Sequence, residues 1–326
     1  QVDVRPLVDG MAKTAFQARN LGRAAEIYAR MLRDKDCTII LTLAGSIFGA
    51  GLKKIVYDMV KHDMVDAIVS TGAIMVDQDF FEGLGFSHYQ GDPRADDSEL
   101  EQLSIDRVYD HYMDDEELDV CDRTIAEIAE SLPKRPYSSR EFIREMGSYL
   151  AKHGKNPESV VQACYEKDVP IFVPAFSDCS AGFGLVHHQW YAKGEKLSID
   201  SVKDFLELTK LKIAAKETGI LMVGGGVPKN FAQDATVSAK FVGHNRPMHR
   251  YAIQLTVADE RDGALSGSTL QEAHSWGKVD LRNEQMVFGE ATVTFPLVAG
   301  YAYHSGDWKK RGEKRFGRVI DEMDPK

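Results

Sequence analysis

Residues 37–51, CTIILTLAGSIFGAG, begin as an apolar run rich in β-branched side chains and end in small residues and glycines. Four more runs have this form: VDAIVST at 65–71, VPIFVPA at 169–175, GILMVGGG at 219–226 and YAIQLTVA at 251–258. Continuous rather than alternating hydrophobicity is typical of strands that are buried on both faces. Each run therefore predicts a central strand of a sheet.

Helical patterns separate these runs. Residues 49–64 carry Leu52, Val56 and Met59 at helical spacing, and residues 201–219 repeat the pattern before a glycine stop. Residues 14–32 predict a helical extension before the first strand. The alternation predicts an α/β fold, in which a parallel sheet carries helices on both faces. The 326 residues suit one large domain of this kind.

Two charged segments interrupt the pattern. Residues 91–135 contain the acidic runs DPRADDSELEQL and YMDDEEL, which we interpret as an insertion with a solvated acidic face. Ser138 and Glu141 follow it with capping-box spacing and predict a helix start. The basic run KKRGEKR at 309–315 is interpreted as a solvated tail rather than a binding patch.

Composition limits the possible partners and location. The net charge of -10 argues against nucleic acid as the main partner and favours a cationic small molecule. No apolar run approaches the length of a membrane helix, and the opening QVDVRPLVDG lacks the pattern of a secretory signal. Four scattered cysteines predict free thiols in a reducing compartment. We therefore expect a cytoplasmic protein without a membrane or metal partner.

The ends of the predicted strands are the first place to look for a ligand site, because ligands of open parallel sheets bind beyond the carboxyl ends. All five ends are small and polar, as in LAGSIFGAG and GGGVPKN. Such ends let a nucleotide approach the backbone, although tight turns use the same residues. The GxGxxG order is missing, so the standard dinucleotide fingerprint is not present. Asp178, Asp262 and Glu290 could accept ribose hydroxyls there, or could cap helices.

Lys278, in QEAHSWGKVDLRNEQ at 271–285, is the candidate nucleophile. An isolated lysine is usually a surface residue. Trp276 could keep water from this amine, favouring its neutral form, and could hold an alkylammonium against its ring. Glu272 could anchor a cationic substrate. A structural role explains His274 equally well. The adjacent histidines His187 and His188 do not have the spacing of a metal site.

Taken together, these motifs resemble the deoxyhypusine synthase family. The resemblance runs from AFQARNLGRAAE near the start, through NPESV and GILMVGGGVPKN, to DGALSGSTLQEAHSWGKV and ATVTFPLVAG. It implies a homotetramer of Rossmann-like subunits, with NAD-containing sites at the subunit interfaces. It also implies that spermidine loses a hydride to NAD, that Lys278 captures the 4-aminobutyl group as an imine, and that an acceptor amine displaces Lys278 before the imine is reduced.

The resemblance assigns residues to the cofactor and to the polyamine. Positions that it implies for NAD are Gly45, Ser46, Gly49, Thr71, Gly72, Ala73, Asp178, Gly224, Gly225, Asp262, Ser266 and Glu290. Positions that it implies for catalysis and substrate are Lys278, Trp276, Glu272, Asp77, Asn230, Phe183 and Leu265. Glu290 replaces an aspartate of the family and keeps its charge.

The substrate positions depart further from the family. Phe183 and Leu265 stand where the family has aspartates that hold spermidine, and Asn230 stands where it has a histidine. Gln78 stands where a second glutamate is expected. The altered pocket favours a small amine as acceptor, giving homospermidine or a related polyamine. The alternatives are a deoxyhypusine synthase acting on a translation-factor lysine, a non-catalytic NAD-binding paralogue, and an NAD-dependent amine dehydrogenase.

Overall fold

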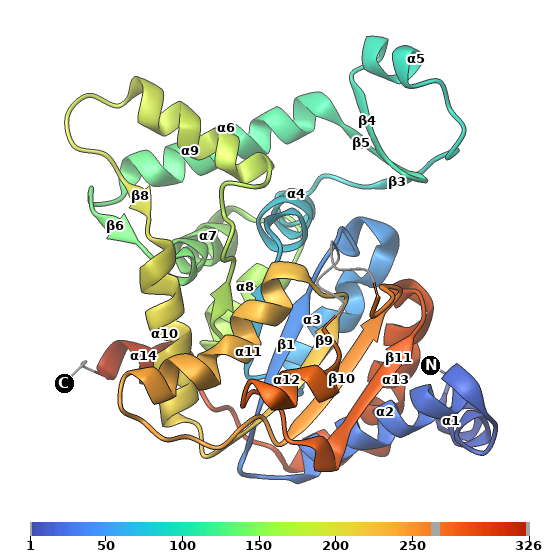
Figure 1. Ribbon diagram of the computed structural model, residues 1–326. Coiled ribbons are helices and arrows are strands. Elements are labelled where there is room, and N and C mark those ends of the chain that lie inside the picture. Colours follow the sequence, from blue (N-terminus) through green and yellow to red (C-terminus); the bar gives the residue numbers. More distant parts are fainter. Residues whose placement is uncertain (1, 262–267, 324–326) are drawn as a thin grey trace.

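The computed structural model describes residues 2–261 and 268–323. Its centre is a parallel sheet, for which six strands are described, with the order β11-β10-β9-β1-β2-β7 (Figure 1). These strands are β1 (Cys37–Leu43), β2 (Ala67–Ser70), β7 (Ile171–Phe172), β9 (Glu217–Val223), β10 (Tyr251–Thr256) and β11 (Glu284–Phe288). All five predicted strands are confirmed, although β2 and β7 are shorter than their apolar runs. The edge strand β11 was not predicted.

Helices cover both faces of the sheet, as the side chains of β1 show. Leu41 and its alternate neighbours belong to one buried cluster, whereas Ile40 belongs to another on the opposite face. This division follows from the two-residue period of a strand. The predicted α/β fold, with helices on both faces, is therefore confirmed.

The helices outside the insertion flank the sheet or lead into it. They are α1 (Arg5–Ala12), α2 (Phe16–Arg33), α3 (Lys53–Lys61), α4 (Asp79–Gly83), α7 (Ser139–His153), α8 (Val160–Lys167), α9 (Ser180–Tyr191), α10 (Ser201–Ala214), α11 (Gly226–Phe241), α12 (Leu270–Ser275), α13 (Ala291–Ser305) and α14 (Phe316–Glu322). Short helical turns are η1 (Phe48–Leu52), η2 (Ala73–Gln78), η4 (Leu281–Asn283) and η5 (Asp307–Lys310). The predicted capping box is present at the start of α7, where Ser138 and Glu141 bond each other's backbone N–H groups. Among the described residues, no helix is long and apolar enough to cross a membrane.

The acidic insertion forms a separate layer above the sheet in Figure 1, between β2 and β7. It contains β3 (Tyr89–Gln90), α5 (Asp97–Gln102), β4 (Ile105–Val108), β5 (His111–Asp114) and α6 (Asp115–Ser131). A short parallel pair, β6 (Pro136–Tyr137) with β8 (Ser198–Ile199), lies nearby. The solvated interpretation holds for the first acidic run, in which Asp92, Asp96 and Glu99 are exposed, but α6 has an apolar face buried in the core. The insertion is therefore a folded part of the molecule.

The basic run at 309–315 was predicted wrongly as a solvated tail. Arg311 reaches the amino end of the sheet, where its guanidinium lies 2.6 Å from the carboxylate of Asp66, and both side chains are almost completely buried. Asp66 also accepts a hydrogen bond from the N–H of Ile39 in β1. The sequence pattern could not reveal this pair, because its members are far apart in the chain.

Candidate functional site: a glycine-lined cavity and an enclosed lysine

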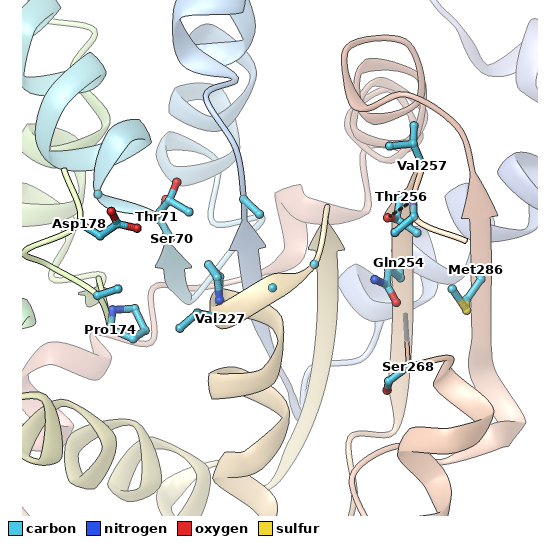
Figure 2. A pocket seen from close by; sticks show the side chains of 17 residues that line it. Ser70, Thr71, Pro174, Asp178, Val227, Gln254, Thr256, Val257, Ser268 and Met286 are labelled. Carbon is cyan, nitrogen blue, oxygen red and sulfur yellow. Dashed lines mark hydrogen bonds between the residues drawn. The ribbon is translucent and has the colours of Figure 1, made fainter. Parts of the chain in front are cut away.

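A cavity of about 370 Å³ lies at the carboxyl ends of the central strands (Figure 2). This is where the sheet architecture predicts a ligand, and the volume lies in the range of small-molecule sites. Its walls come from the ends of β1, β2, β9 and β10, from the loop after β7 and from the start of α11. The lining residues are Ala44, Ser70, Thr71, Gly72, Pro174, Ala175, Asp178, Gly225, Gly226, Val227, Pro228, Gln254, Thr256, Val257, Ala258, Ser268 and Met286.

The glycine triplet after β9 shapes one wall of this cavity. Gly224 and Gly226 have φ angles of 81° and 62°, a region that favours glycine. The triplet turns the chain into α11, and within residues 2–261 and 268–323 no side chain caps the first N–H groups of that helix. Uncapped N–H groups at a helix N-terminus, together with the helix dipole, attract anions. This wall therefore suits the pyrophosphate of a dinucleotide.

Two polar atoms in the cavity wall have no partner among the described residues. They are Oγ of Ser70 and Oε1 of Gln254, and both are buried. The amide nitrogen of Gln254 is already bonded to the carbonyl of Gly224, which fixes the side chain. Buried polar atoms normally have hydrogen-bond partners. These two atoms, with the exposed carboxylate of Asp178, provide hydrogen-bonding groups for ribose and amide groups, and the residues present therefore fit NAD.

The predicted cofactor positions divide into three groups. Thr71, Gly72, Asp178 and Gly225 line the cavity, and Gly224 adjoins it. The remaining described positions lie in neighbouring loops and are not among the lining residues: Gly45, Ser46, Gly49, Ala73 and Glu290. Glu290 caps α13, where its carboxylate accepts a hydrogen bond from the N–H of Thr292. Asp262 and Ser266 lie outside the described residues.

Lys278 lies in a cluster of its own, on the outer side of α11 and α12. Its Nζ lies 2.6 Å from Oδ1 of Asp234, in α11, and 5.7 Å from the ring centre of Trp276. The lysine side chain is 17% exposed, so it is largely enclosed. Trp276 is itself 66% exposed and covers the amine from one side only. The predicted proximity of aromatic and anionic groups to Lys278 is thus observed, but the closest carboxylate is Asp234.

The backbone holds Lys278 firmly. Gly277, with a φ of 74°, ends the short helix α12 and turns the chain toward the sheet. The carbonyl of Lys278 then accepts a hydrogen bond from the N–H of His249, just before β10. Val279 is fully buried and pairs with His249 in an isolated bridge. The side chain of Lys278 therefore starts from a fixed point of the fold.

A second lysine, Lys229, connects the cluster with the cavity. It is fully buried, and its amine donates to the carbonyl of Ser268, a lining residue of the cavity. Burial lowers the pKa of Lys229 to about 8, with the carboxylate of Glu272 acting in the opposite direction and the charge of Lys278 in the same direction. Glu272 and Lys278 therefore both lie within electrostatic range of Lys229.

The other predicted substrate positions are distributed over two regions. Asn230 lies one helical turn before Asp234 in α11 and shares its face. Asp77 lies in η2 and Phe183 lies in α9. The N–H groups of Ser180 and Ala181, at the start of α9, donate hydrogen bonds to Asp77. Burial raises the pKa of Asp77 to about 6 although these hydrogen bonds lower it. Phe183 is exposed, and Leu265 lies outside the described residues.

The comparison with known proteins identifies the family of this chain. The family model described as deoxyhypusine synthase matches residues 6–302. The chain belongs to the deoxyhypusine synthase family. A deoxyhypusine synthase-like protein of Chlorobaculum parvum is 62% identical over 98% of this chain and 91% of its own length. A Methanosarcina mazei protein named probable deoxyhypusine synthase 2 is 41% identical over 97% of this chain and 90% of its own.

A solved structure shares the fold of this chain. A crystal structure of an Entamoeba histolytica protein of the deoxyhypusine synthase kind has a TM-score of 0.65 at 20% identity. The match covers 96% of both chains and shows a shared fold. Membership of the deoxyhypusine synthase family makes the chain a member of a family of transferases.

Several residues of the site were not predicted from the sequence. Asp234, Lys229 and Gln254 have no motif of their own, and only their positions in the fold associate them with the cavity or with Lys278. A carboxylate at the centre of a predicted helix could have suggested a buried charge, but a solvated face explains such a residue equally well.

Proposed function

We propose that this protein transfers a 4-aminobutyl group from spermidine, through an imine on Lys278, to a small amine, with NAD as cofactor and homospermidine or a related polyamine as product. The observation that carries this proposal is the enclosed amine of Lys278, which is paired with Asp234 and covered by Trp276. An enclosed lysine next to an aromatic face and a carboxylate is suited to form an imine with an amine-derived carbon. The cofactor supplies hydride transfer when bound at the glycine-lined cavity.

Asp234 has a defined part in this proposal. The lysine must lose a proton to act as a nucleophile, and the imine that it forms becomes positively charged when protonated. A carboxylate at 2.6 Å can accept a hydrogen bond from the amine in the resting state and then act as counter-ion of the protonated imine. Asp234 therefore contributes a negative charge to the substrate region. Phe183 and Leu265, which stand where the family has aspartates, contribute none.

The active site is proposed to require two copies of the chain. Within one copy, Val227 lines the cavity and Asp234 lies seven residues later in the same helix, which corresponds to about 10 Å along the helix axis. Trp276 is exposed next to Lys278, and Val237 and Phe241 are exposed on the face of α11 that carries Asp234. Exposed apolar groups of this kind are typical of protein interfaces. They support the homotetramer with interfacial sites that the resemblance implies.

A second candidate function is the modification of a lysine on a translation factor, as the name of the family model suggests. The two functions share the donor half of the reaction and differ only in the acceptor. For either function we propose a cytoplasmic location, which the free thiols of all four cysteines support.

A product profile tests the proposal. Purified protein is incubated with NAD and labelled spermidine, with and without putrescine, and the products are separated by chromatography and mass spectrometry. Homospermidine that appears with the wild type and disappears with Lys278→Ala is the expected result. Labelled deoxyhypusine on added translation factor, without homospermidine, would support the second candidate. NADH that accumulates in amounts matching the consumed amine would instead identify a dehydrogenase.

A further inference from the structure

A second cavity, of about 280 Å³, lies beside the glycine-lined cavity, between the first two strand-end loops and the acidic insertion. Ser46 and Ala73 line it, and they follow closely after Ala44 and Gly72 of the first cavity. Its remaining walls come from η2, α4, the β4–β5 hairpin and the start of α6. At Asp106 it continues into a wider acidic groove along α6. The insertion thus builds a second chamber next to the proposed cofactor site.

His88 presents an unpaired nitrogen in this chamber. Its side chain is only 6% exposed and lines the cavity. Its Nδ1 lies 2.9 Å from the carboxylate of Glu82, which in turn pairs with the buried amine of Lys53. Its Nε2 is buried and has no hydrogen-bond partner among the described residues.

The neighbours of His88 decide which form its ring takes. Burial alone would raise the pKa of Glu82, but the hydrogen bonds from His88 and Lys53 outweigh this effect and lower the pKa. Glu82 is therefore an anion that accepts the Nδ1–H of His88. In the neutral ring this leaves Nε2 with a lone pair and no proton. A buried acceptor of this kind needs a donor, which a ligand or an ordered water can supply.

The other polar groups of the chamber indicate that the donor is a cation. Arg107 is already neutralised, because its guanidinium binds both carboxylate oxygens of Asp97 at 2.7 and 2.8 Å. Asp106, on the rim, has neither an ion pair nor a hydrogen bond among the described residues. Asp77 is partly buried and has no salt bridge among the described residues, and burial raises its pKa to about 6. A cation would stabilise the charged forms of both acids.

The apolar part of the chamber limits the shape of this cation. Phe81, Val108, Met113 and Leu118 form the walls between the polar groups. They suit methylene groups, while the volume is at the lower end for ligand sites. A short chain of methylenes with an ammonium group satisfies all of these features.

We propose that the second chamber binds a short aliphatic diamine by its protonated end, with His88 and Asp106 as recognition groups, and that its other, neutral amine is the acceptor of the transfer. This neutral amine forms the new C–N bond to the imine carbon, the bond from that carbon to Nζ of Lys278 breaks, and the lysine amine takes up the proton that the acceptor loses. The identification as acceptor rests on the proposed function. It also follows from the chemistry, since the new imine must be reduced at the cofactor and the acceptor must therefore approach next to the glycine-lined cavity.

Direct binding tests the chamber. Putrescine is titrated into the NAD-loaded protein in a calorimeter, with 1,4-butanediol as the uncharged analogue that should not bind. Losing a charged or buried hydrogen bond should raise the Kd for putrescine about 3- to 10-fold in Asp106→Asn and at least about 10-fold in His88→Phe. Asp110→Asn is the matched control, because it removes the same charge from an exposed position in the same hairpin. Its Kd should stay within about 2-fold of the wild type.

The outcomes separate this inference from the proposed function. No detectable putrescine binding, or binding that both chamber variants leave unchanged, overturns the chamber as an amine site. Wild-type protein that binds putrescine with the expected variant effects, but never releases diaminopropane from spermidine, refutes the transferase and leaves the amine site intact. Thermal melting of Asp106→Asn, whose carboxylate has no bonds to lose, shows whether altered binding reflects altered folding.

Discussion

Nζ of Lys278 and Oδ1 of Asp234 lie 2.6 Å apart, although one residue follows α12 and the other lies in the middle of α11. The pair joins the candidate nucleophile to the helix whose N-terminus forms the cavity wall. A shift of α11 at the glycine-lined cavity would therefore change the position of the carboxylate that pairs with Lys278.

Replacing Asp234 by asparagine should lower kcat/KM for spermidine cleavage about 10- to 100-fold, because the protonated imine loses its counter-ion. The measurement is the initial rate of diaminopropane release, together with borohydride trapping of the lysine adduct by mass spectrometry. Glu195→Gln removes an exposed charge elsewhere and should leave both unchanged. An Asp234→Asn enzyme with wild-type rate and trapping would contradict the assigned role.

Replacing Ser70 by alanine should weaken NAD binding by about 3- to 10-fold without loss of stability. The reason is that its buried Oγ has no partner among the described residues and lines the cavity, so only a ligand can satisfy it. Calorimetric titration with NAD and urea unfolding of the apoprotein measure the two effects. Ser201→Ala, at an exposed position in the first turn of α10, serves as the control. Unchanged NAD affinity would mean that the hydroxyl does not face the cofactor.

The buried Lys212 should make the free energy of unfolding depend on pH. Its side chain is buried against Thr218, and burial lowers its pKa from 10.5 to about 7. Below pH 7 the folded state also binds the proton and bears the full cost of a buried charge. Between about pH 7 and 10.5 the unfolded chain still holds a proton that the folded protein has released, so stability rises with pH.

Lys212→Met should therefore be more stable than the wild type at pH 6, and its advantage should shrink at pH 9. Urea unfolding at the two pH values measures the difference. The exposed substitution Lys193→Met should show no such trend. An advantage of Lys212→Met that is the same at both pH values would show that packing, rather than charge, is responsible.

Replacing Arg311 by glutamine should cost about 3–5 kcal/mol of unfolding free energy, since it leaves the carboxylate of Asp66 buried without its nearest cation. Arg318→Gln breaks an exposed pair with Glu322 and should cost less than about 0.5 kcal/mol. Urea unfolding of both variants at pH 7 gives the comparison. Equal effects would mean that Asp66 is neutral or otherwise compensated.

Sequence patterns predicted the parts of the fold that depend on local order. The five apolar runs became strands because a strand covered on both faces must be apolar along its whole length. The capping box of Ser138 and Glu141 could also be predicted, because both of its residues lie within one helical turn of each other. The glycine triplet was associated with the cavity because the carboxyl ends of parallel strands meet at one edge.

Contacts between distant parts of the chain could not be predicted in this way. The basic run that contains Arg311 has the composition of a solvated tail, and only the fold brings it to Asp66. Likewise, the acids of residues 91–135 looked like a solvated surface, yet α6 has a buried face. Asp234 acquires its significance only when α11 and α12 are packed together.

The place of the insertion in the sheet has a consequence for how such proteins diversify. β2 and β7 are direct neighbours, with Ile68 paired to Ile171, so residues 71–170 leave and re-enter the sheet at adjacent strands. Because the entropy of closing a loop depends only weakly on its length, the exposed parts of this stretch can gain or lose residues at little cost to the rest of the sheet. Changes confined to the hairpin of β4 and β5 can therefore remodel the wall of the second chamber, while Thr71 and Gly72 at the end of β2 and the glycine turn after β9 keep the shape of the first cavity.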